Sequence, residues 1–257
     1  MAVKDRLKLI QSKILIDNKV VVSELSAEFG VTEETIRRDL EKLENEGILT
    51  RTFGGAVLNM AAQMGGIHFY KRAATHLAEK KMMAEAFRPF LRGKTTIAAD
   101  ASSTVMEALK LLDDSQEITV LTTSTEIFRE LAHTNINVIS TGGVYQKSAL
   151  SLQGQVAKDN IKKYHVDIVL LGCKGLDLEM GATDSIEGEA NVKKVMREQG
   201  TEAALFVDHS KFDRKAFTRL LDWNEIDYLV TDQKPEEKWV QVCEENKIKL
   251  VYPADER

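Results

Sequence analysis

The chain has 257 residues, a formal net charge of −5 and a sequence pI of about 5.7. The length suits one large domain or two modest ones, and the acidic balance gives no indication of a nucleic-acid partner. The five histidines and two cysteines lack ligand spacing, so we expect neither a metal nor a cofactor. The first residues form an amphipathic pattern rather than a signal peptide, and no apolar run approaches membrane length, so we expect a cytoplasmic protein.

Residues 23–55 are predicted to form a helix, a tight turn, a second helix and a hairpin. Ser23 is placed to cap the first helix. Gly30 allows the positive φ of a sharp turn, and Thr32 is expected to cap the second helix. This order of elements is typical of a winged helix-turn-helix domain that binds DNA.

The second helix is predicted to have one buried face and one basic face. Ile36, Leu40 and Leu43 recur at i, i+4 and i+7 and form the buried stripe. At about 100° per residue, Arg38 and Lys42 point nearly away from that stripe. Guanidinium and hydroxyl groups on the outer face of a second helix suit base edges and phosphates in a major groove.

A basic hairpin is predicted after the second helix. Gly47 is expected to end the helix, and Gly54-Gly55 to form the tight turn between the strands 48–53 and 56–58. Arg51 is placed to meet the DNA backbone. The residues that we expect to contact DNA are Ser23, Thr32, Glu34, Thr35, Arg37, Arg38, Lys42, Arg51, Gly54 and Gly55.

The prediction of DNA binding rests on where the residues lie in the helices and the hairpin. The pair Arg37 and Arg38 alone would favour an ordinary solvated surface helix. Residues 1–60 hold nine Lys+Arg and ten Asp+Glu, a net charge of −1. The turn, stripe, cap and hairpin nevertheless all indicate the same domain. The runs TIRRDLEKLENEG and LTRTFGGA closely resemble the N-terminal motif of the DeoR family of bacterial transcriptional regulators. That resemblance implies a repressor whose second helix binds an operator.

The sequence pattern changes character after about residue 60. Residues 59–75 lack a clean period and contain Gly65-Gly66, so we place a linker there. This divides the chain into a DNA-binding domain at residues 1–58 and a second domain at residues 76–257, which begins with a helical pattern.

The second domain alternates short apolar runs with helical patterns. Apolar runs without polar alternation are buried on both faces, so we predict an α/β fold with an open, mostly parallel sheet covered by helices. The expected strands are Thr95–Asp100, Ile118–Thr123, Ile136–Thr141, Val166–Gly172, Ala203–Asp208, Tyr228–Asp232 and Leu250–Tyr252. The expected helices lie near residues 103–113, 125–133, 154–164, 187–199 and 235–246.

Small, hydroxylated and charged residues follow five of these strands. The carboxyl ends of parallel strands meet at one edge, where open α/β sheets bind ligands. Hydroxyl and backbone N–H groups converge at Ser102, Ser103 and Thr104, which favours a phosphate, and Lys211 can neutralise its charge. Each cluster alone is more often a helix cap or a turn, but five on one edge indicate a pocket for a small ligand.

This half also resembles the DeoR-type sensor domain, which is similar in fold to ribose-5-phosphate isomerase. DASST resembles the family's D-S-G-T-T phosphate loop, VDHSKF resembles its D-x-S-K segment, and GCKGLDLEMGATDSIEGEANVKK resembles the segment that lines the sugar. Ser102 stands where glycine is common, and a Cβ there would crowd the phosphate or force the loop to open.

The resemblance implies separate contacts to the two parts of a sugar phosphate. Those expected to hold the phosphate are Asp100, Ser102, Ser103, Thr104 and Lys211, and those expected to contact sugar hydroxyls are Asp177 and Glu189. The full set of expected effector-binding residues is Asp100, Ala101, Ser102, Ser103, Thr104, Thr123, Ser124, Gly142, Gly143, Lys174, Gly175, Asp177, Glu189 and Lys211.

Two alternatives concern the second domain. A working sugar-phosphate isomerase needs a base and groups that polarise the carbonyl, and Asp177 and Glu189 are the candidate carboxylates. The isomerases carry a K-G-x-G segment whose lysine helps to stabilise the charged intermediate, but the matching stretch 179–183 has no lysine. We therefore expect no catalytic residue. The other alternative is a domain that only oligomerises, with inert caps at the strand ends.

These observations predict a transcriptional repressor of sugar metabolism genes. Its expected partners are double-stranded operator DNA and a small phosphorylated sugar, with no membrane. Helix-turn-helix domains that bind symmetric half-sites need at least a dimer, so we expect a homo-oligomer, either a dimer or a tetramer. An effector that prefers the conformation unfit for the operator would weaken DNA binding by its differential affinity.

Overall fold

The structure is a computed structural model that describes residues 3–45, 48–59, 67–113 and 115–254. The chain forms two compact units. The first unit comprises Met1–Thr75 and Lys147–Ala149, and the second comprises His76–Gln146 and Leu150–Arg257. Among the helices of the described ranges, none has the length and apolar character needed to cross a membrane.

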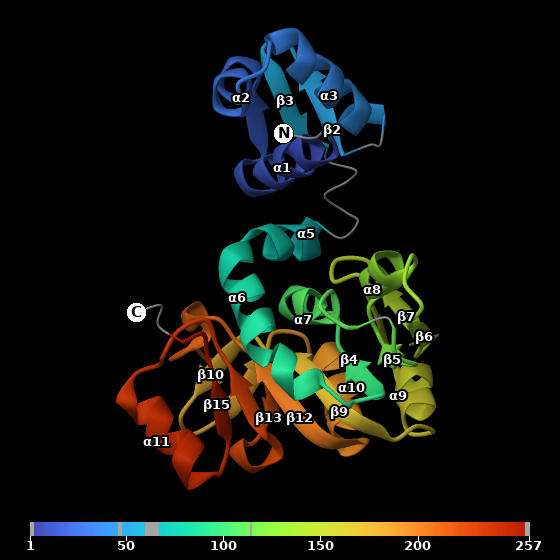
Figure 1. Ribbon diagram of the computed structural model, residues 1–257, viewed down its shortest axis with the longest axis vertical. Helices are drawn as coiled ribbons and strands as arrows, with labels where there is room; N and C mark the ends of the chain where they lie inside the picture. The colour runs from blue at the N-terminus through green and yellow to red at the C-terminus, as the bar shows by residue number, and fades with distance from the viewer. Residues whose placement is uncertain (1–2, 46–47, 60–66, 114, 255–257) are drawn as a thin grey trace. The chain divides into compact units, whose positions relative to one another are not determined.

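The first unit is a winged helix-turn-helix, as the sequence predicts (Figure 1). Its helices are α1 (Val3–Asp17), α2 (Val22–Phe29), α3 (Glu33–Asn45) and α5 (Ile67–Ala74). Its strands are β1 (Lys19–Val21), β2 (Leu49–Thr52) and β3 (Gly55–Leu58), which form an antiparallel sheet in the order β1-β3-β2. The three-residue strand β1 is too short to give a period in the sequence, and it was not predicted.

The buried stripe of α3 is confirmed. Ile36, Leu40 and Leu43 are buried in a core that α1 and β2 complete. Asp39 is buried on the same helix, where its Oδ2 lies 2.5 Å from the Nε of Arg6 on α1. A buried carboxylate requires such a partner, and the partner here lies 33 residues earlier in the chain.

The predicted Ser23 cap is wrong. Helix α2 begins at Val22, its N-cap is Val21, and no side chain caps it. Val21 is the last residue of β1, and the backbone N–H of Val22 donates to the carbonyl of Gly54 at 2.9 Å. Pairing with the β2–β3 hairpin, which we call the wing, therefore fixes where this helix starts. Ser23 is an exposed residue of the first turn of α2.

The predicted hairpin is present, but its turn lies one residue earlier than expected. Phe53 and Gly54 form the turn, and Gly55 is the first residue of β3. A Cβ on Gly55 would collide with the backbone of Val20, so close strand packing requires this glycine. The predicted helix end at Gly47 lies outside the described residues.

Helix α5 lies within the segment predicted to be a linker. It packs against α1, Tyr70 joins the core of the first unit, and Lys71 donates to the side chain of Asn18 at 3.2 Å. The first unit therefore extends past the predicted boundary at residue 58. A helix of eight residues is stable mainly through such tertiary contacts, which local periodicity does not report.

The second unit contains the predicted open parallel sheet, with seven strands in the order β15-β14-β12-β9-β4-β5-β6. All pair in parallel and lie where the sequence predicts strands: β4 (Thr96–Ala99), β5 (Thr119–Thr122), β6 (Asn137–Ser140), β9 (Val166–Gly172), β12 (Gly200–Phe206), β14 (Tyr228–Val230) and β15 (Lys249–Val251).

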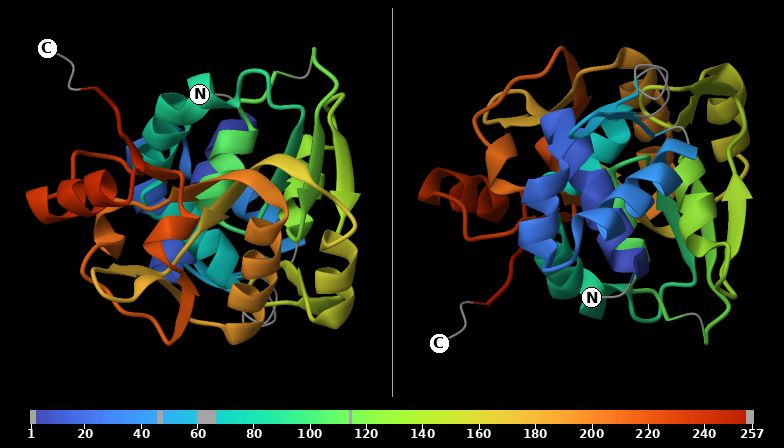
Figure 2. Two further views of the ribbon diagram at one scale, coloured as in Figure 1. Left: turned by 90° about the horizontal axis from the view of Figure 1, so that it is seen from below. Right: turned by 90° about the horizontal axis from the view of Figure 1, so that it is seen from above.

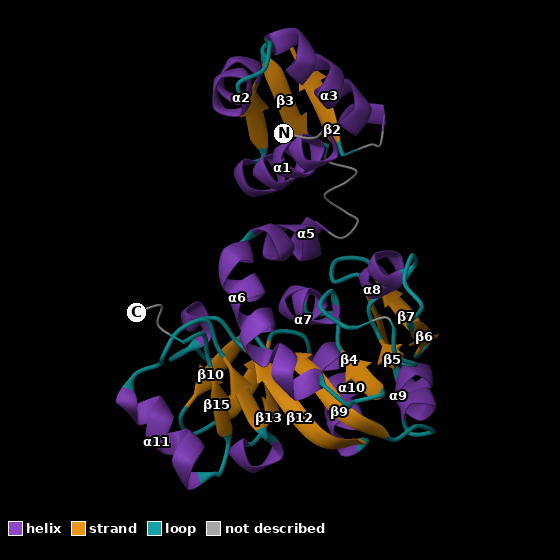
Figure 3. Cartoon of the chain, in the orientation of Figure 1, coloured by secondary structure: helices purple, strands orange, loops and turns teal. Residues whose placement is uncertain are grey.

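Helices cover both faces of this sheet (Figure 3). They are α6 (Leu77–Phe87), α7 (Ser103–Leu109), α8 (Thr125–Leu131), α9 (Gln155–Ile161), α10 (Glu187–Glu198) and α11 (Glu237–Glu245). Helices α9 and α10 lie side by side (Figure 2). Leu205 of β12 packs in their core, whereas the next residue, Phe206, meets Phe87 of α6 with ring centroids 5.1 Å apart.

Short antiparallel elements add to the second unit and were not predicted, since strands of three or four residues give no clear period. Strands β7 (Val144–Gln146) and β8 (Ser151–Gln153) pair with each other. Strands β10 (Gly175–Asp177), β11 (Gly181–Asp184) and β13 (Thr218–Leu221) form a three-stranded sheet. A short 3-10 helix at His209–Lys211 follows β12.

Candidate DNA-binding surface and effector site

The turn before α3 has the predicted chemistry. Gly30 adopts a left-handed conformation with φ of 63°, and no atom would obstruct a side chain there, so its conformation explains the glycine. The Oγ1 of Thr32 accepts the backbone N–H of Thr35 at 3.3 Å and lies 2.9 Å from the hydroxyl of Thr35. The predicted Thr32 cap is confirmed, and it holds both hydroxyls at the start of α3.

The two arginines of α3 lie on its exposed face, and each pairs with a glutamate one turn earlier. Arg37 Nη2 lies 2.6 Å from Glu33 Oε2, and Arg38 Nε lies 3.4 Å from Glu34 Oε1. The Arg38 side chain is 72% exposed. Exposed pairs of this kind add little stability. Their consequence for binding is that a DNA phosphate must compete with a carboxylate of the same helix.

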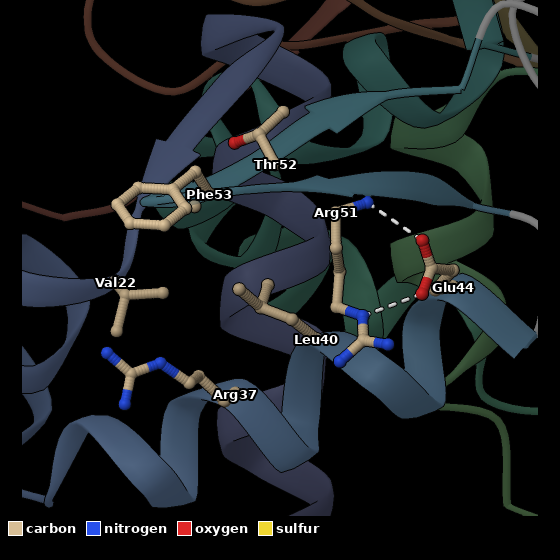
Figure 4. Close-up of a pocket in the computed structure, with 8 residues that line it drawn as sticks. Val22, Arg37, Leu40, Glu44, Arg51, Thr52 and Phe53 are labelled. Carbon is tan, nitrogen blue, oxygen red and sulfur yellow. Dashed lines mark hydrogen bonds and ion pairs between the residues drawn. The ribbon is translucent and has the colours of Figure 1, made fainter.

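A third arginine joins the wing to α3. The Glu44 carboxylate accepts the backbone N–H of Arg51 at 2.9 Å and its Nε at 2.6 Å (Figure 4). The pKa of the Glu44 carboxyl is held below its ordinary value, mainly by the hydrogen bond from the backbone N–H of Arg51 and next by the one from its side chain. Glu44 therefore orients Arg51.

A groove with a volume of about 290 Å³ lies between α3 and the wing. Figure 4 shows Arg37 on α3 and Arg51 on β2 at its edges, with Phe53 at the wing turn. Two guanidinium groups beside a fully exposed aromatic ring suit the phosphates and sugars of a DNA backbone. The groove is lined by Val22, Arg37, Leu40, Glu44, Arg51, Thr52, Phe53 and Gly55. Thr52 and Phe53 were not predicted, although an aromatic residue beside a glycine turn was a signal for the latter.

Because carboxylates compete for the α3 arginines, we expect the double variant Glu33→Gln and Glu34→Gln to bind random-sequence DNA about 3- to 10-fold more tightly. Fluorescence anisotropy across a salt series would measure this affinity. The matched control is Glu236→Gln with Glu237→Gln, which removes two exposed charges from the second unit. Equal affinity of the α3 variant and the wild-type protein for random DNA would show that the pairs do not limit binding.

In the second unit, the loop after β4 is shaped by a buried carboxylate. Asp100 Oδ1 accepts the N–H of Ser102 at 2.9 Å, and Oδ2 accepts the N–H of Gly172 at 3.0 Å. Ser102 Oγ in turn accepts the N–H of Thr104 at 3.2 Å and caps α7. Asp100 therefore holds the loop in shape, since a carboxylate cannot itself attract a phosphate.

Lys193 of α10 completes a buried ion cluster behind this loop. Its Nζ lies 2.7 Å from Asp184 Oδ2 and 2.9 Å from Asp100 Oδ2, and it donates to the Gly172 carbonyl at 2.9 Å. Burial opposes the charged forms of Lys193 and Asp184, but the ion pairs prevail. Attraction to Asp100 first, and then to Asp184, raises the pKa of Lys193, and attraction to Lys193 lowers the pKa of Asp184. Asp184 and Lys193 were not predicted as site residues, although Lys193 follows Glu189 by four residues on one helical face.

The structure shows how Ser102 is accommodated where the family commonly has glycine. The Ser102 side chain lies over Gly172, and a Cβ on Gly172 would collide with its Cβ and Oγ. Gly172 at the end of β9 therefore makes room for this serine. The loop of residues 100–104 therefore accommodates the Ser102 side chain, whose Oγ still accepts the N–H of Thr104.

The loop after β12 carries Lys211. Asp208 accepts the N–H of Ser210 at 2.9 Å and also its hydroxyl, and Lys211 Nζ lies 3.4 Å from Asp208 Oδ2. His209 is tied to Asp232 at the end of β14, through its N–H at 2.6 Å and its Nδ1 at 2.6 Å. The hydrogen bond to Asp232 raises the pKa of His209.

Glu189 of α10 lies near the end of β5. Its Oε1 accepts the hydroxyl of Ser151 at 3.3 Å, and Ser151 forms a bridge with Ser124 at the end of β5. Thr123, the residue after β5, also contacts β8, because its carbonyl accepts the N–H of Leu152 at 2.8 Å. Residues from β5, β8 and α10 thus meet at one point of the edge.

Other predicted effector residues serve local structure. Asp177 accepts the N–H groups of Glu179 and Met180 at 3.1 and 3.0 Å, so it closes the β10–β11 hairpin. A Cβ on Gly143 would collide with the Gln153 backbone, and one on Gly175 would collide with the Arg214 backbone. The remaining members lie beside these groups: Ala101 is buried in the β4 loop, Gly142 follows β6 with φ of 63°, and Lys174 donates its N–H to Thr183 at 2.9 Å.

A winged helix-turn-helix domain is typical of proteins that bind DNA, and an open parallel sheet with polar loops at the carboxyl ends of its strands is typical of ligand-binding domains. Together they define a DNA-binding regulator that responds to a ligand. The DeoR-like helix-turn-helix domain matches residues 6–62, and the DeoR C terminal sensor domain matches residues 75–233. The chain belongs to the DeoR family of transcriptional regulators. The predicted family and the predicted function as a DNA-binding transcriptional regulator are confirmed.

Individual relatives cover nearly the whole chain. The uncharacterised helix-turn-helix transcriptional regulator YulB of Bacillus subtilis is 38% identical over 97% of this chain and 96% of its own length. The L-fucose operon activator of Haemophilus influenzae is 32% identical over 91% of this chain and 93% of its own length. Among solved structures, ribose 5-phosphate isomerase A of Methanocaldococcus jannaschii is similar at 15% identity with a TM-score of 0.41, over 54% of this chain and 55% of that one.

Proposed function

We propose that this regulator is a repressor of sugar metabolism genes, and that a phosphorylated sugar bound at the carboxyl edge of the large sheet controls its operator binding. It would act in the cytoplasm, where the operator lies, as a homo-oligomer whose helix-turn-helix units bind symmetric half-sites. The second unit would bind its sugar without converting it.

One observation carries the effector proposal: two polar loops flank the end of one strand. Strands β4 and β12 both pair with β9, so their ends are two strand spacings apart, about 10 Å. The loop of residues 100–104 follows one of them and the loop of residues 208–211 follows the other. A sugar phosphate is long enough to contact both loops.

The roles follow from the contacts of each side chain. Ser102, Ser103 and Thr104 would offer hydroxyl and N–H groups to the phosphate, and Lys211 would supply the positive charge. Glu189 would accept hydroxyls of the sugar. A sensor is supported over an isomerase because the Lys193 ammonium is held by two carboxylates and a carbonyl, which leaves it unsuited to stabilising a charged intermediate.

A thermal-shift screen tests this proposal with ribose 5-phosphate, glucose 6-phosphate and fructose 1-phosphate, each beside its unphosphorylated parent. We expect one phosphate, and not its parent, to raise the melting temperature. A flat screen would favour an unphosphorylated ligand or a unit that only oligomerises. Expression of the regulated genes in a deletion strain would distinguish repression from activation, because loss of a repressor should raise their expression.

The variant Lys211→Ala should bind the stabilising sugar phosphate at least about tenfold more weakly, because it loses a charge-assisted contact worth roughly 1.5–3 kcal/mol. Operator affinity without the sugar should be unchanged. Calorimetry would measure sugar binding, with the exposed Lys234→Ala as a matched control. If Lys211→Ala binds the sugar phosphate as tightly as the wild-type protein, the assignment of the phosphate site is wrong.

A further inference from the structure

The second unit begins with a backbone conformation that is uncommon for residues other than glycine. His76, its first residue, has φ of 53° and ψ of 40°, which is the left-handed region. Residues with a Cβ avoid this region, and single exceptions persist where the surroundings hold them. Thr75, the residue before it, ends the first unit. His76 is therefore a left-handed residue at the point of the chain where the first unit ends and the second begins.

The His76 ring lies against the loop that carries Lys211. It meets the ring of His209 edge-on, with centroids 5.4 Å apart and an interplanar angle of 79°. Its Nδ1 lies 3.5 Å from Oε1 of Glu79, in the first turn of α6. His209 is the first residue of the 3-10 helix that ends at Lys211. A shift of this loop would thus change the contact that holds His76.

One turn further along α6, Lys80 reaches the other polar loop. This side chain is almost fully buried, with 4% of the residue exposed, and its Nζ donates to Ser103 Oγ at 3.1 Å. Ser103 is the first residue of α7. His76 is the N-cap of α6, and its carbonyl accepts the backbone N–H of Lys80 at 3.1 Å. Helix α6 consequently contacts both loops assigned to the effector.

We propose that α6 is a positioning element of the effector site, in which Lys80 holds the loop of residues 100–104, His76 holds the loop of residues 208–211, and a ligand on these loops acts on the junction between the units through His76. This inference rests on the proposed function. It names the two residues through which the effector would alter DNA binding.

The physical basis is linkage between the loops and the junction. An effector changes operator affinity only if it interacts differently with the two conformations. When the His209 ring supports His76, the left-handed conformation is favoured. When the loop moves to meet a phosphate, that support is lost and His76 can relax into the common regions of backbone space. The backbone conformation at His76, where the second unit begins, then changes.

Three variants test the proposal: His76→Ala, Lys80→Met and the conservative Lys80→Arg. The controls are His133→Ala, which alters an exposed histidine, and Lys81→Met, which alters the exposed neighbour of Lys80. The DNA is a duplex selected by the wild-type protein from a random-sequence pool. The ligand is whichever of ribose 5-phosphate, glucose 6-phosphate and fructose 1-phosphate gives the largest thermal shift. Operator Kd is measured with and without saturating ligand.

We expect the ligand to change the operator Kd of the wild-type protein by at least tenfold. Because alanine cannot make the ring contact with His209, His76→Ala without ligand should have an operator Kd within threefold of that of the ligand-bound wild-type protein. The ligand should change this Kd less than threefold, and it should bind the variant at least as tightly as it binds the wild-type protein. Lys80→Met should bind the ligand at least tenfold more weakly, and Lys80→Arg should recover most of that loss. A full ligand response in His76→Ala would overturn the inference.

A ligand-free measurement separates this inference from the proposed function. Hydrogen exchange at residues 208–211 should be faster in His76→Ala than in His133→Ala, and exchange at residues 100–104 should be faster in Lys80→Met than in Lys81→Met. If exchange changes in this way but no sugar phosphate binds the wild-type protein, the positioning contacts stand and the effector assignment fails. Unchanged exchange in both loops overturns the positioning role whatever the ligand screen shows.

Discussion

Replacing Lys193 with methionine is expected to destabilise the second unit by about 3–5 kcal/mol, because the change leaves two buried carboxylates without their cation. Asp100 and Asp184 are both almost fully buried, and each lies within 3 Å of the Lys193 ammonium. Methionine is close to lysine in length, so the loss arises from charge rather than from a cavity. Chemical denaturation of the full chain, followed by a probe of the second unit, measures the effect.

The same cluster predicts how stability depends on pH. The folded pKa of Asp184 is lowered, so its contribution is present above its unfolded pKa, about 3.9, and is lost as the pH falls through the folded value. The folded pKa of Lys193 is raised, so its contribution is present below its unfolded pKa, about 10.4, and is lost as the pH rises through the folded value. The deficit of Lys193→Met should therefore be largest near neutral pH and should shrink in acid.

Lys194→Met is the matched control, since it alters the neighbouring, more exposed lysine of α10. The combined variant of Asp184→Asn with Lys193→Met should recover part of the loss, because one uncompensated charge is removed. Stability of Lys193→Met equal to that of Lys194→Met would contradict a structural role for the ion cluster.

Replacing Arg38 with alanine is expected to weaken operator binding by about 1–3 kcal/mol, or roughly 5- to 150-fold, if its guanidinium contacts a base. Arg38 lies on the exposed face of α3, away from the buried stripe, and only Glu34 of the same helix pairs with it among the described residues. Base contacts by residues of the second helix supply sequence discrimination in helix-turn-helix domains. Effector binding by the second unit should be unaffected.

Competition binding with operator and random-sequence DNA separates the two ways in which Arg38 can act. Loss of affinity for the operator alone indicates a base contact, whereas equal loss for both, with a shallower salt dependence, indicates a phosphate contact. Arg92→Ala, which removes an exposed arginine from the second unit, is the control. Undiminished operator binding by Arg38→Ala would refute its role at the DNA surface.

The order of elements and the class of each domain were predictable from sequence. The stripe of α3, the αL turn at Gly30 and the Thr32 cap depend on residues within a few positions of one another, which periodicity and capping rules report directly. The inner strands of the large sheet were predictable because strands buried on both faces are apolar throughout. The same local order placed the polar loops of residues 100–104 and 208–211 at one edge.

The partners of buried charges and the limits of short elements required the tertiary structure. Arg6 pairs with Asp39, and Lys193 joins Asp100 to Asp184, across separations that no helical or strand period spans. Because β1 pairs with β3, α2 begins at Val22 and not after a cap at Ser23. Helix α5 lies where the sequence predicted a linker. Periodicity shows which side of an element is buried, but the residue that meets a buried charge is fixed by how distant elements pack.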